Sequence, residues 1–143
     1  FSHNSGHLWQ TLLGWKTDPH WDPLHILSNL LIFAGFLLLA SAWRVLHSAQ
    51  QSGEPALDGP YGRIRHPQYV AFILVMFGFL LQWPTLPTLL MFPFLVYLYV
   101  RLAHREEQQS LREFGERYRA YMEQTPAFVP NWRNPQSGTE QTR

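Results

Sequence analysis

The stretch from Pro67 to Val100 contains no charged residue, and no other feature restricts the fold of this chain as strongly. A polar block lies on each side of it, GPYGRIRHPQY at residues 59–69 and REEQQSLREFGERYRAY at residues 105–121. The run is too long for one membrane-spanning helix, which needs about 20 residues, and about right for two short ones. A hairpin of two helices would place both polar blocks at the same membrane face.

The turn of this hairpin is predicted at Trp83–Pro87, because Pro84 and Pro87 disfavour helix there. The arms are then expected at Tyr69–Gln82 and Thr88–Val100, with a kink at Pro93 in the second arm. Each arm is slightly short for the bilayer, so its ends are expected to extend into the polar blocks. Pro67 suits the first position of a helix.

A further span is predicted at residues 26–43, which carry no charge and have no polar stripe. The alternative is a buried helix of a soluble bundle. The sequence therefore predicts an all-α integral membrane bundle of about three transmembrane helices, which include a C-terminal helical hairpin. A cytoplasmic amphipathic helix is expected after the hairpin, because Leu111, Phe114, Tyr118 and Tyr121 recur at helical spacing. This stripe either packs on the end of the bundle or lines a pocket.

Arginines gather in residues 44–66 and after residue 100, whereas only Lys16 precedes the first span. By the positive-inside rule, both polar blocks face the cytoplasm. We expect a multi-pass protein of the bacterial inner membrane or endoplasmic reticulum. Its 143 residues would form one domain, with an extracytoplasmic or interfacial segment at 1–25, the membrane core and site at 26–130, and a flexible tail at 131–143.

Composition excludes several classes of function. There is no cysteine, so thiolate catalysis, disulfides and cysteine metal sites are excluded. The net charge of +1 argues against a nucleic-acid partner. No signal peptide is expected before Ile26. His3 and His7 have the i, i+4 spacing of a metal pair, but interfacial histidines beside tryptophans are the plainer interpretation, and no metal site is assigned.

The polar blocks carry groups suited to a ligand. The first turn after His66-Pro67 offers unpaired backbone N–H groups. Arg101 and Arg105, at i, i+4, could hold one carboxylate or phosphate, or could extend to anionic head groups as membrane anchors. Glu106 could accept hydrogen bonds from ribose hydroxyls or neutralise a cationic ligand.

Together the two blocks resemble the isoprenylcysteine carboxyl methyltransferase family and the related phospholipid N-methyltransferases, over roughly residues 53–130. The shared pattern is GPY, four residues, HPxY, an apolar hairpin, EE, three residues, L, two residues, FG, two residues, Y, and a closing Pro–Phe–Pro. Here it comprises Gly59, Pro60, Tyr61, His66, Pro67, Tyr69, Glu106, Glu107, Leu111, Phe114, Gly115, Tyr118, Pro126, Phe128 and Pro130.

The resemblance implies a membrane S-adenosylmethionine-dependent methyltransferase, with a lipidic or small-molecule acceptor that is a carboxylate, an amine or a thiol. It implies that the cofactor is held by Tyr61, His66, Pro67, Gln68, Tyr69 and Glu106. It also implies that Arg101 or Arg105 lies at the acceptor. Two alternatives remain: an NADPH-dependent membrane reductase related to sterol reductases, whose RxxRHPxY-like region Arg63, Arg65 and His66 fit loosely, and a non-enzymatic membrane adaptor.

Overall fold

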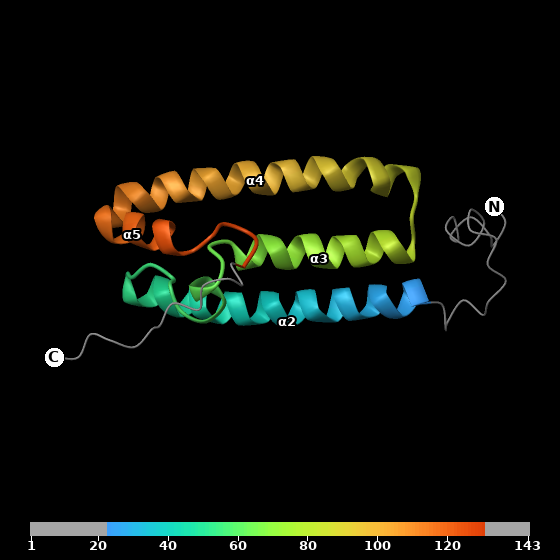
Figure 1. Ribbon diagram of the computed structural model, residues 1–143, viewed down its shortest axis with the longest axis horizontal. Coiled ribbons are helices and arrows are strands. Elements are labelled where there is room, and N and C mark those ends of the chain that lie inside the picture. The colour runs from blue at the N-terminus through green and yellow to red at the C-terminus, as the bar shows by residue number, and fades with distance from the viewer. Residues whose placement is uncertain (1–22, 131–143) are drawn as a thin grey trace.

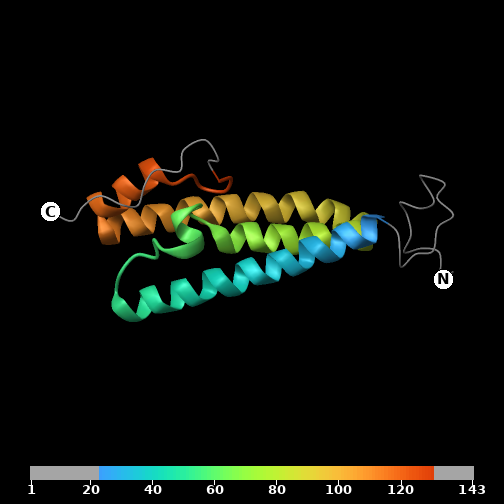
Figure 2. The same cartoon turned by 60° about the horizontal axis from the view of Figure 1, so that its bottom comes forward.

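A computed structural model describes residues 23–130 and shows helices without strands in that part of the chain (Figure 1). The elements are α2 (Pro23–Ser52), the 3-10 turn η2 (Gly59–Gly62), α3 (Pro67–Gln82), α4 (Leu86–Phe114) and α5 (Glu116–Gln124). Helices α2, α3 and α4 lie side by side along the long axis, with α3 between the other two (Figures 1 and 2). The predicted all-α fold is confirmed.

Helices α2 and α3 approach closely because small residues line their contact. Ser28, Gly35 and Ala42 are the buried residues of α2, and they recur every seven positions along its inner face. A Cβ atom on Gly35 would lie 2.6 Å from Val75 Cγ2 and 3.0 Å from the Ala71 carbonyl oxygen. The Ser28 hydroxyl donates a 2.8 Å hydrogen bond to the backbone carbonyl of α3 at residue 78. Such close backbone approach favours dispersion contacts, which matter where lipid tails compete with side chains.

Aromatic rings form much of the contact between α3 and α4. Tyr99 of α4 stacks on Tyr69 and Phe72, with ring centroids 5.4 and 5.8 Å apart, and Phe77 meets Phe92 at 5.8 Å. Offset ring pairs at this separation are favourable beyond the area they bury. The central helix therefore meets one neighbour through small residues and the other through rings.

The hairpin turn is as predicted, because α3 ends at Gln82 and α4 begins at Leu86. Thr85 caps α4: its Oγ1 accepts from the backbone N–H of Thr88, and the Thr88 hydroxyl accepts from the backbone N–H of Thr85. Pro67 is the first residue of α3, as expected. Pro93 lies inside α4, where its ring removes one backbone donor.

Two helices extend beyond the uncharged segments. Helix α4 continues past Val100 to Phe114, into the second polar block as expected, and α2 continues nine residues past the predicted limit of Trp43 to Ser52. The end of an uncharged segment is not the end of a helix, because a helix continues into water when its residues favour it and nothing breaks it. The single amphipathic helix predicted for the tail is also wrong, because Gly115, at φ 56°, separates α4 from α5.

Helices α2 and α4 are long and apolar enough to cross a membrane. Helix α3, of 16 residues, spans about 24 Å and is a shorter apolar helix, so two of the three predicted spans reach full length. Large apolar side chains of α2 and α4 point outward: Phe33 is 63% and Leu90 is 75% exposed. An exposed apolar surface of this kind suits lipid.

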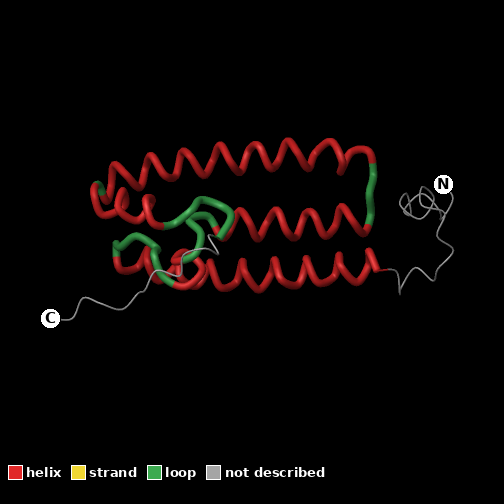
Figure 3. The backbone as a smooth tube through the Cα atoms, in the orientation of Figure 1, coloured by secondary structure: helices red, strands yellow, loops and turns green. Residues whose placement is uncertain are grey.

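The two polar blocks meet at one end of the bundle. Element η2 and α5 lie at the end of the helices opposite the α3–α4 turn (Figures 1 and 3). The hairpin thus brings the two blocks together, as the uncharged run predicted. The segments 1–22 and 131–143, with the expected interfacial segment and tail, lie outside the described residues.

We predict that Gly35→Val lowers the free energy of unfolding in detergent by about 1–3 kcal/mol, because the added atoms would overlap the Ala71 carbonyl and Val75 of α3. Ala34→Val, at the neighbouring exposed position of α2, is the matched control, and its expected effect is a few tenths of a kcal/mol. Thermal unfolding of both variants measures the difference. Equal stability of the two would contradict close packing at residue 35.

Candidate functional site

The connection into α3 is joined to the chain after α5 by backbone hydrogen bonds. The N–H of Arg65 donates to the carbonyl of Pro126 at 2.9 Å, and the N–H of His66 donates to the carbonyl of Ala127 at 3.1 Å. Residues 65–66 and 126–127 therefore lie side by side, although about 60 residues separate them in sequence. The closing segment of the motif, Pro126 to Pro130, therefore begins beside the connection into α3.

The Arg65 side chain connects three elements. Its Nε donates to Glu107 Oε1 of α4 at 2.8 Å. Its Nη1 donates to the carbonyls of Met122 and Thr125, both at 2.8 Å, at the C-terminal end of α5. The arginine and glutamate side chains are only 13% and 9% exposed. The bonds satisfy carbonyls that a helix end leaves unpaired, and they fix the orientation of α5 against α4.

His66 is buried between the same elements. Its Nε2 lies 3.1 Å from Glu107 Oε1, and its Nδ1 lies 3.7 Å from Glu106 Oε2. Its ring packs between Tyr69 and Phe128, at centroid distances of 5.7 and 5.6 Å. Burial lowers the pKa of His66, and the Glu107 carboxylate partly offsets that shift. The imidazole is thus held in one orientation, with one edge toward each glutamate.

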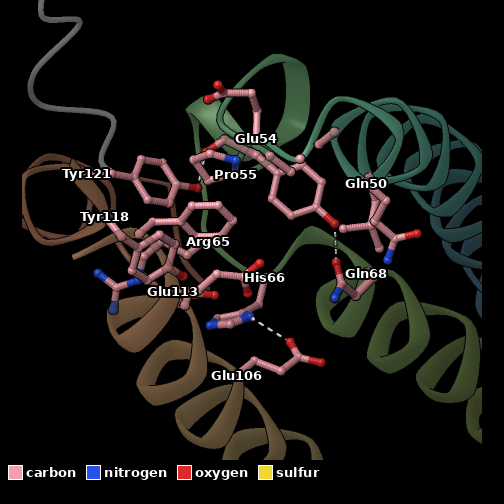
Figure 4. Close-up of a pocket in the computed structure, with 17 residues that line it drawn as sticks. Gln50, Glu54, Pro55, Arg65, His66, Gln68, Glu106, Glu113, Tyr118 and Tyr121 are labelled. Atoms are coloured by element: carbon pink, nitrogen blue, oxygen red, sulfur yellow. Dashed lines mark hydrogen bonds and ion pairs between the residues drawn. The ribbon is translucent and has the colours of Figure 1, made fainter. Parts of the chain in front are cut away.

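Next to His66 lies a cavity of about 320 Å³, between α2, α4, α5 and the connection into α3 (Figure 4). This volume is near the lower limit of small-molecule pockets. Polar, aromatic and small side chains form its walls: Leu46, Ala49, Gln50, Gly53, Glu54, Pro55, Ala56, Tyr61, Arg65, His66, Gln68, Glu106, Ser110, Glu113, Phe114, Tyr118 and Tyr121.

Three tyrosines give this cavity ring surfaces with fixed hydroxyls. The Tyr61 hydroxyl donates to Gln68 Oε1, and the Tyr121 hydroxyl donates to the Tyr61 carbonyl at 2.6 Å. Burial raises the pKa values of Tyr61, Tyr118 and Tyr121. All three are therefore neutral over a wide pH range, and their rings offer faces on which a flat ligand can stack.

The charges on the cavity wall are mainly negative. Glu54, Glu106 and Glu113 line it, and the cation Arg65 is already bonded to Glu107. Arg117 pairs with Glu54 at the surface. Glu106 is oriented by the Tyr69 hydroxyl, which donates to its Oε1. A cationic ligand is the electrostatic complement of such a wall.

Four of the six residues predicted to hold a cofactor line the cavity: Tyr61, His66, Gln68 and Glu106. The other two lie behind it. Pro67 is fully buried at the start of α3, and Tyr69 is buried against Glu106. The structure thus brings all six to one place, in two layers.

Arg101 and Arg105 are exposed on α4 and do not line this cavity. At 100° per residue, both point more than 90° away from Glu106, which faces the cavity. Their predicted role at the acceptor stays a prediction, for an acceptor that reaches α4 from the lipid side.

Several functional candidates were missed from the sequence. The motif includes Glu107 without assigning it a role, and the sequence indicates Arg65 only for membrane orientation and for the reductase alternative. Of the stripe Leu111, Phe114, Tyr118 and Tyr121, for which packing and lining are both predicted, the last three line the cavity. Glu54 gave no usable signal, because its loop lacks a distinctive pattern.

Among residues 23–130, no group of three or more histidine and acidic side chains has an arrangement that could hold a metal ion. His3 and His7 lie outside the described residues, and their possible pairing is not tested.

We predict that Arg65→Met lowers the free energy of unfolding by roughly 3 kcal/mol, because it leaves the mostly buried Glu107 carboxylate without its cation. Arg117→Met, which removes the exposed pair with Glu54, should cost at most about 1 kcal/mol. Denaturant unfolding in detergent compares them. A loss for Arg65→Met no larger than that of the control would show that this bond does not hold the site together.

Comparison with known protein families gives a match over most of the same residues. A family model described as "Phospholipid methyltransferase" matches residues 22–117, more than half of the chain and most of the helical bundle. No match was found among curated proteins or among solved structures. The match confirms the predicted relation to phospholipid methyltransferases, and the isoprenylcysteine branch stays a prediction. Two helices of the chain are long and apolar enough to cross a bilayer, which fits a membrane protein of this methyltransferase family. The chain belongs to the phospholipid methyltransferase family.

Proposed function

We propose that this protein transfers a methyl group from S-adenosylmethionine to a lipidic acceptor at the cytoplasmic face of a membrane. One observation carries the proposal: an acidic, ring-lined cavity lies where two candidate membrane helices reach a polar end. The family suggests the methyl transfer, and the cavity supports the choice of donor.

The cavity residues fit this donor by their chemistry. S-adenosylmethionine supplies a methyl group on a positively charged sulfur, attached to an adenosine. The tyrosine rings offer faces to a flat base, and Gln68 offers amide hydrogen bonds. Glu106 can accept hydroxyl hydrogen bonds, and Tyr69 and His66 keep it in place. These residues would bind and orient the donor.

The sign of the charge favours this donor over the nicotinamide alternative. NADPH carries several phosphates, which require cations or free helix N-termini. In the described part of the chain, the lining holds Glu106 and Glu113, which have no arginine partner, and Glu54, which pairs with Arg117. Its one arginine is committed to Glu107. A dinucleotide phosphate would meet repulsion there, whereas a sulfonium would not.

The acceptor is taken to be a phospholipid headgroup amine, as the family description suggests, with a carboxylate and a thiol as the chemical alternatives. An amine attacks only when neutral, with its lone pair in line with the methyl group. The protein's contribution is alignment and exclusion of water. The exposed apolar faces of α2 and α4 would let such an acceptor arrive from the bilayer.

The cytoplasmic orientation rests on the arginines at the cavity end of the bundle, Arg44, Arg63, Arg65, Arg101, Arg105, Arg112, Arg117 and Arg119. The Trp83–Pro87 turn at the other end has no charged residue.

We expect micromolar binding of S-adenosylmethionine, weakened by more than about 1 kcal/mol in both His66→Ala and Glu106→Ala, since each removes a buried or charge-assisted hydrogen bond. Equilibrium dialysis with labelled cofactor measures it. Glu123→Ala, an exposed position of α5 outside the cavity lining, is the control and should bind as the wild type does. Unchanged binding in both test variants, with wild-type unfolding temperatures, would remove the assigned pocket.

A second expectation concerns the arginines of α4. If one of them orients an anionic part of the acceptor, replacement by Lys keeps the charge but loses the bidentate hydrogen bonding of the guanidinium. Methyl transfer should then slow or the acceptor KM should rise, with cofactor affinity intact. We expect Arg101→Lys to be severe and Arg105→Lys mild, because Arg101 lies deeper toward the apolar layer. Arg112→Lys is the matched control, and full activity in both test variants would make these arginines membrane anchors only.

A further inference from the structure

A second cavity, of about 430 Å³, lies against the C-terminal third of α2 and the loop 53–58. Figure 2 shows this end of α2 diverging from the other helices before the loop returns to η2. Ala49, Glu54, Pro55 and Ala56 line both cavities. The two cavities therefore adjoin along these four residues.

Polar side chains of α2 form one wall of the second cavity. Ser41, Arg44, Ser48 and Ser52 line it, and their spacing of three or four residues places them on one helix face. The row is about 16 Å long, from the apolar part of α2 to the loop beside the first cavity. One end thus lies where lipid tails would begin, and the other lies next to the proposed donor.

The charges of this cavity are separated rather than paired. Within residues 23–130, the Arg44 guanidinium and the Asp58 carboxylate, both lining the cavity, have no ion pair or side-chain hydrogen bond to another residue. Glu54, the third charged side chain there, pairs with Arg117. A guanidinium and serine hydroxyls are donors suited to phosphate oxygens, and a free carboxylate is suited to an amine.

We propose that the second cavity binds the acceptor headgroup, a phosphate diester carrying an amine. Arg44, Ser41 and Ser48 hold the phosphate, whereas the Ser52 hydroxyl already donates to backbone carbonyls of α2. Asp58 holds the amine on the loop side, toward the first cavity. This assignment rests on the proposed function for its role in the reaction. It gives the phosphate a position at the membrane boundary, and it means that Asp58 holds the protonated amine, which must lose its proton before the nitrogen attacks.

The test measures binding of dihexanoyl-phosphatidylethanolamine to the purified protein in detergent, without cofactor, by titration calorimetry. Arg44→Gln should weaken binding at least tenfold and Asp58→Asn severalfold. Arg112→Gln removes an exposed arginine at the same end of the bundle that lines neither cavity, and it should stay within twofold of the wild type. Arg44→Lys should retain part of the affinity, and unchanged unfolding temperatures exclude loss of fold.

Two ligand variants separate the roles of the charges. Dihexanoyl-phosphatidic acid lacks the amine, and its binding should be insensitive to Asp58→Asn. Free phosphoethanolamine lacks the lipid tails and should bind more weakly than the lipid. If Arg44→Gln and Arg112→Gln bind the lipid with equal affinity, the headgroup site is overturned. If the wild type binds free phosphoethanolamine as tightly as the lipid, the site does not recognise the lipid tails and is not a lipid site.

Cofactor binding separates this inference from the proposed function. Arg44→Gln should bind labelled S-adenosylmethionine as the wild type does. A wild type that binds the lipid through Arg44 but does not bind the cofactor would overturn the methyltransferase proposal and leave a headgroup site. Loss of cofactor affinity in Arg44→Gln would overturn the division into two cavities.

Discussion

The Arg65 guanidinium holds together the parts of the chain that form the first cavity. It bonds to Glu107 on α4 and to the last carbonyls of α5, while its own backbone N–H pairs with Pro126. Glu107 in turn lies against His66. Without this side chain, α5 would lose its bonds to the site arginine and would be held by the Tyr121–Tyr61 and Arg117–Glu54 contacts, by the backbone bonds of residues 126–127, and by its connection through Gly115. The tyrosines of α5 reach the cavity because the arginine fixes that helix.

The two kinds of helix contact explain why the polar end is open while the apolar part is closed. Small residues bring α2 and α3 together along the apolar stretch, as at Gly35. Ala42 is the last buried residue of α2, and the C-terminal end of this helix diverges from its neighbours (Figure 2). The loop 53–58 enters the space that results, and its residues line both cavities. The proposed donor and acceptor sites are thus both consequences of where close packing stops.

Charge then distinguishes the two cavities. The first presents three carboxylates and an arginine that is already engaged, which suits a cation. The second presents the separated charges of Arg44 and Asp58, which suit a zwitterion. Both lie at the end of the bundle where apolar helix faces give way to polar residues, so a lipidic acceptor need not leave the bilayer completely.

The sequence by itself determined the helical hairpin, its turn and the meeting of the two polar blocks, because absence of charge over Pro67–Val100 and the prolines at 84 and 87 act locally. It also indicated Tyr61, His66, Gln68 and Glu106 through their motif. It could not give the partners of Arg65, since the bonds to Glu107, Met122 and Thr125 cross 42 to 60 residues. Only the tertiary structure decided that Tyr69 supports the cavity from behind, and that Arg101 and Arg105 face away from it. Those outcomes depend on how each helix is rotated about its axis, and that rotation is set by packing against neighbours rather than by local sequence.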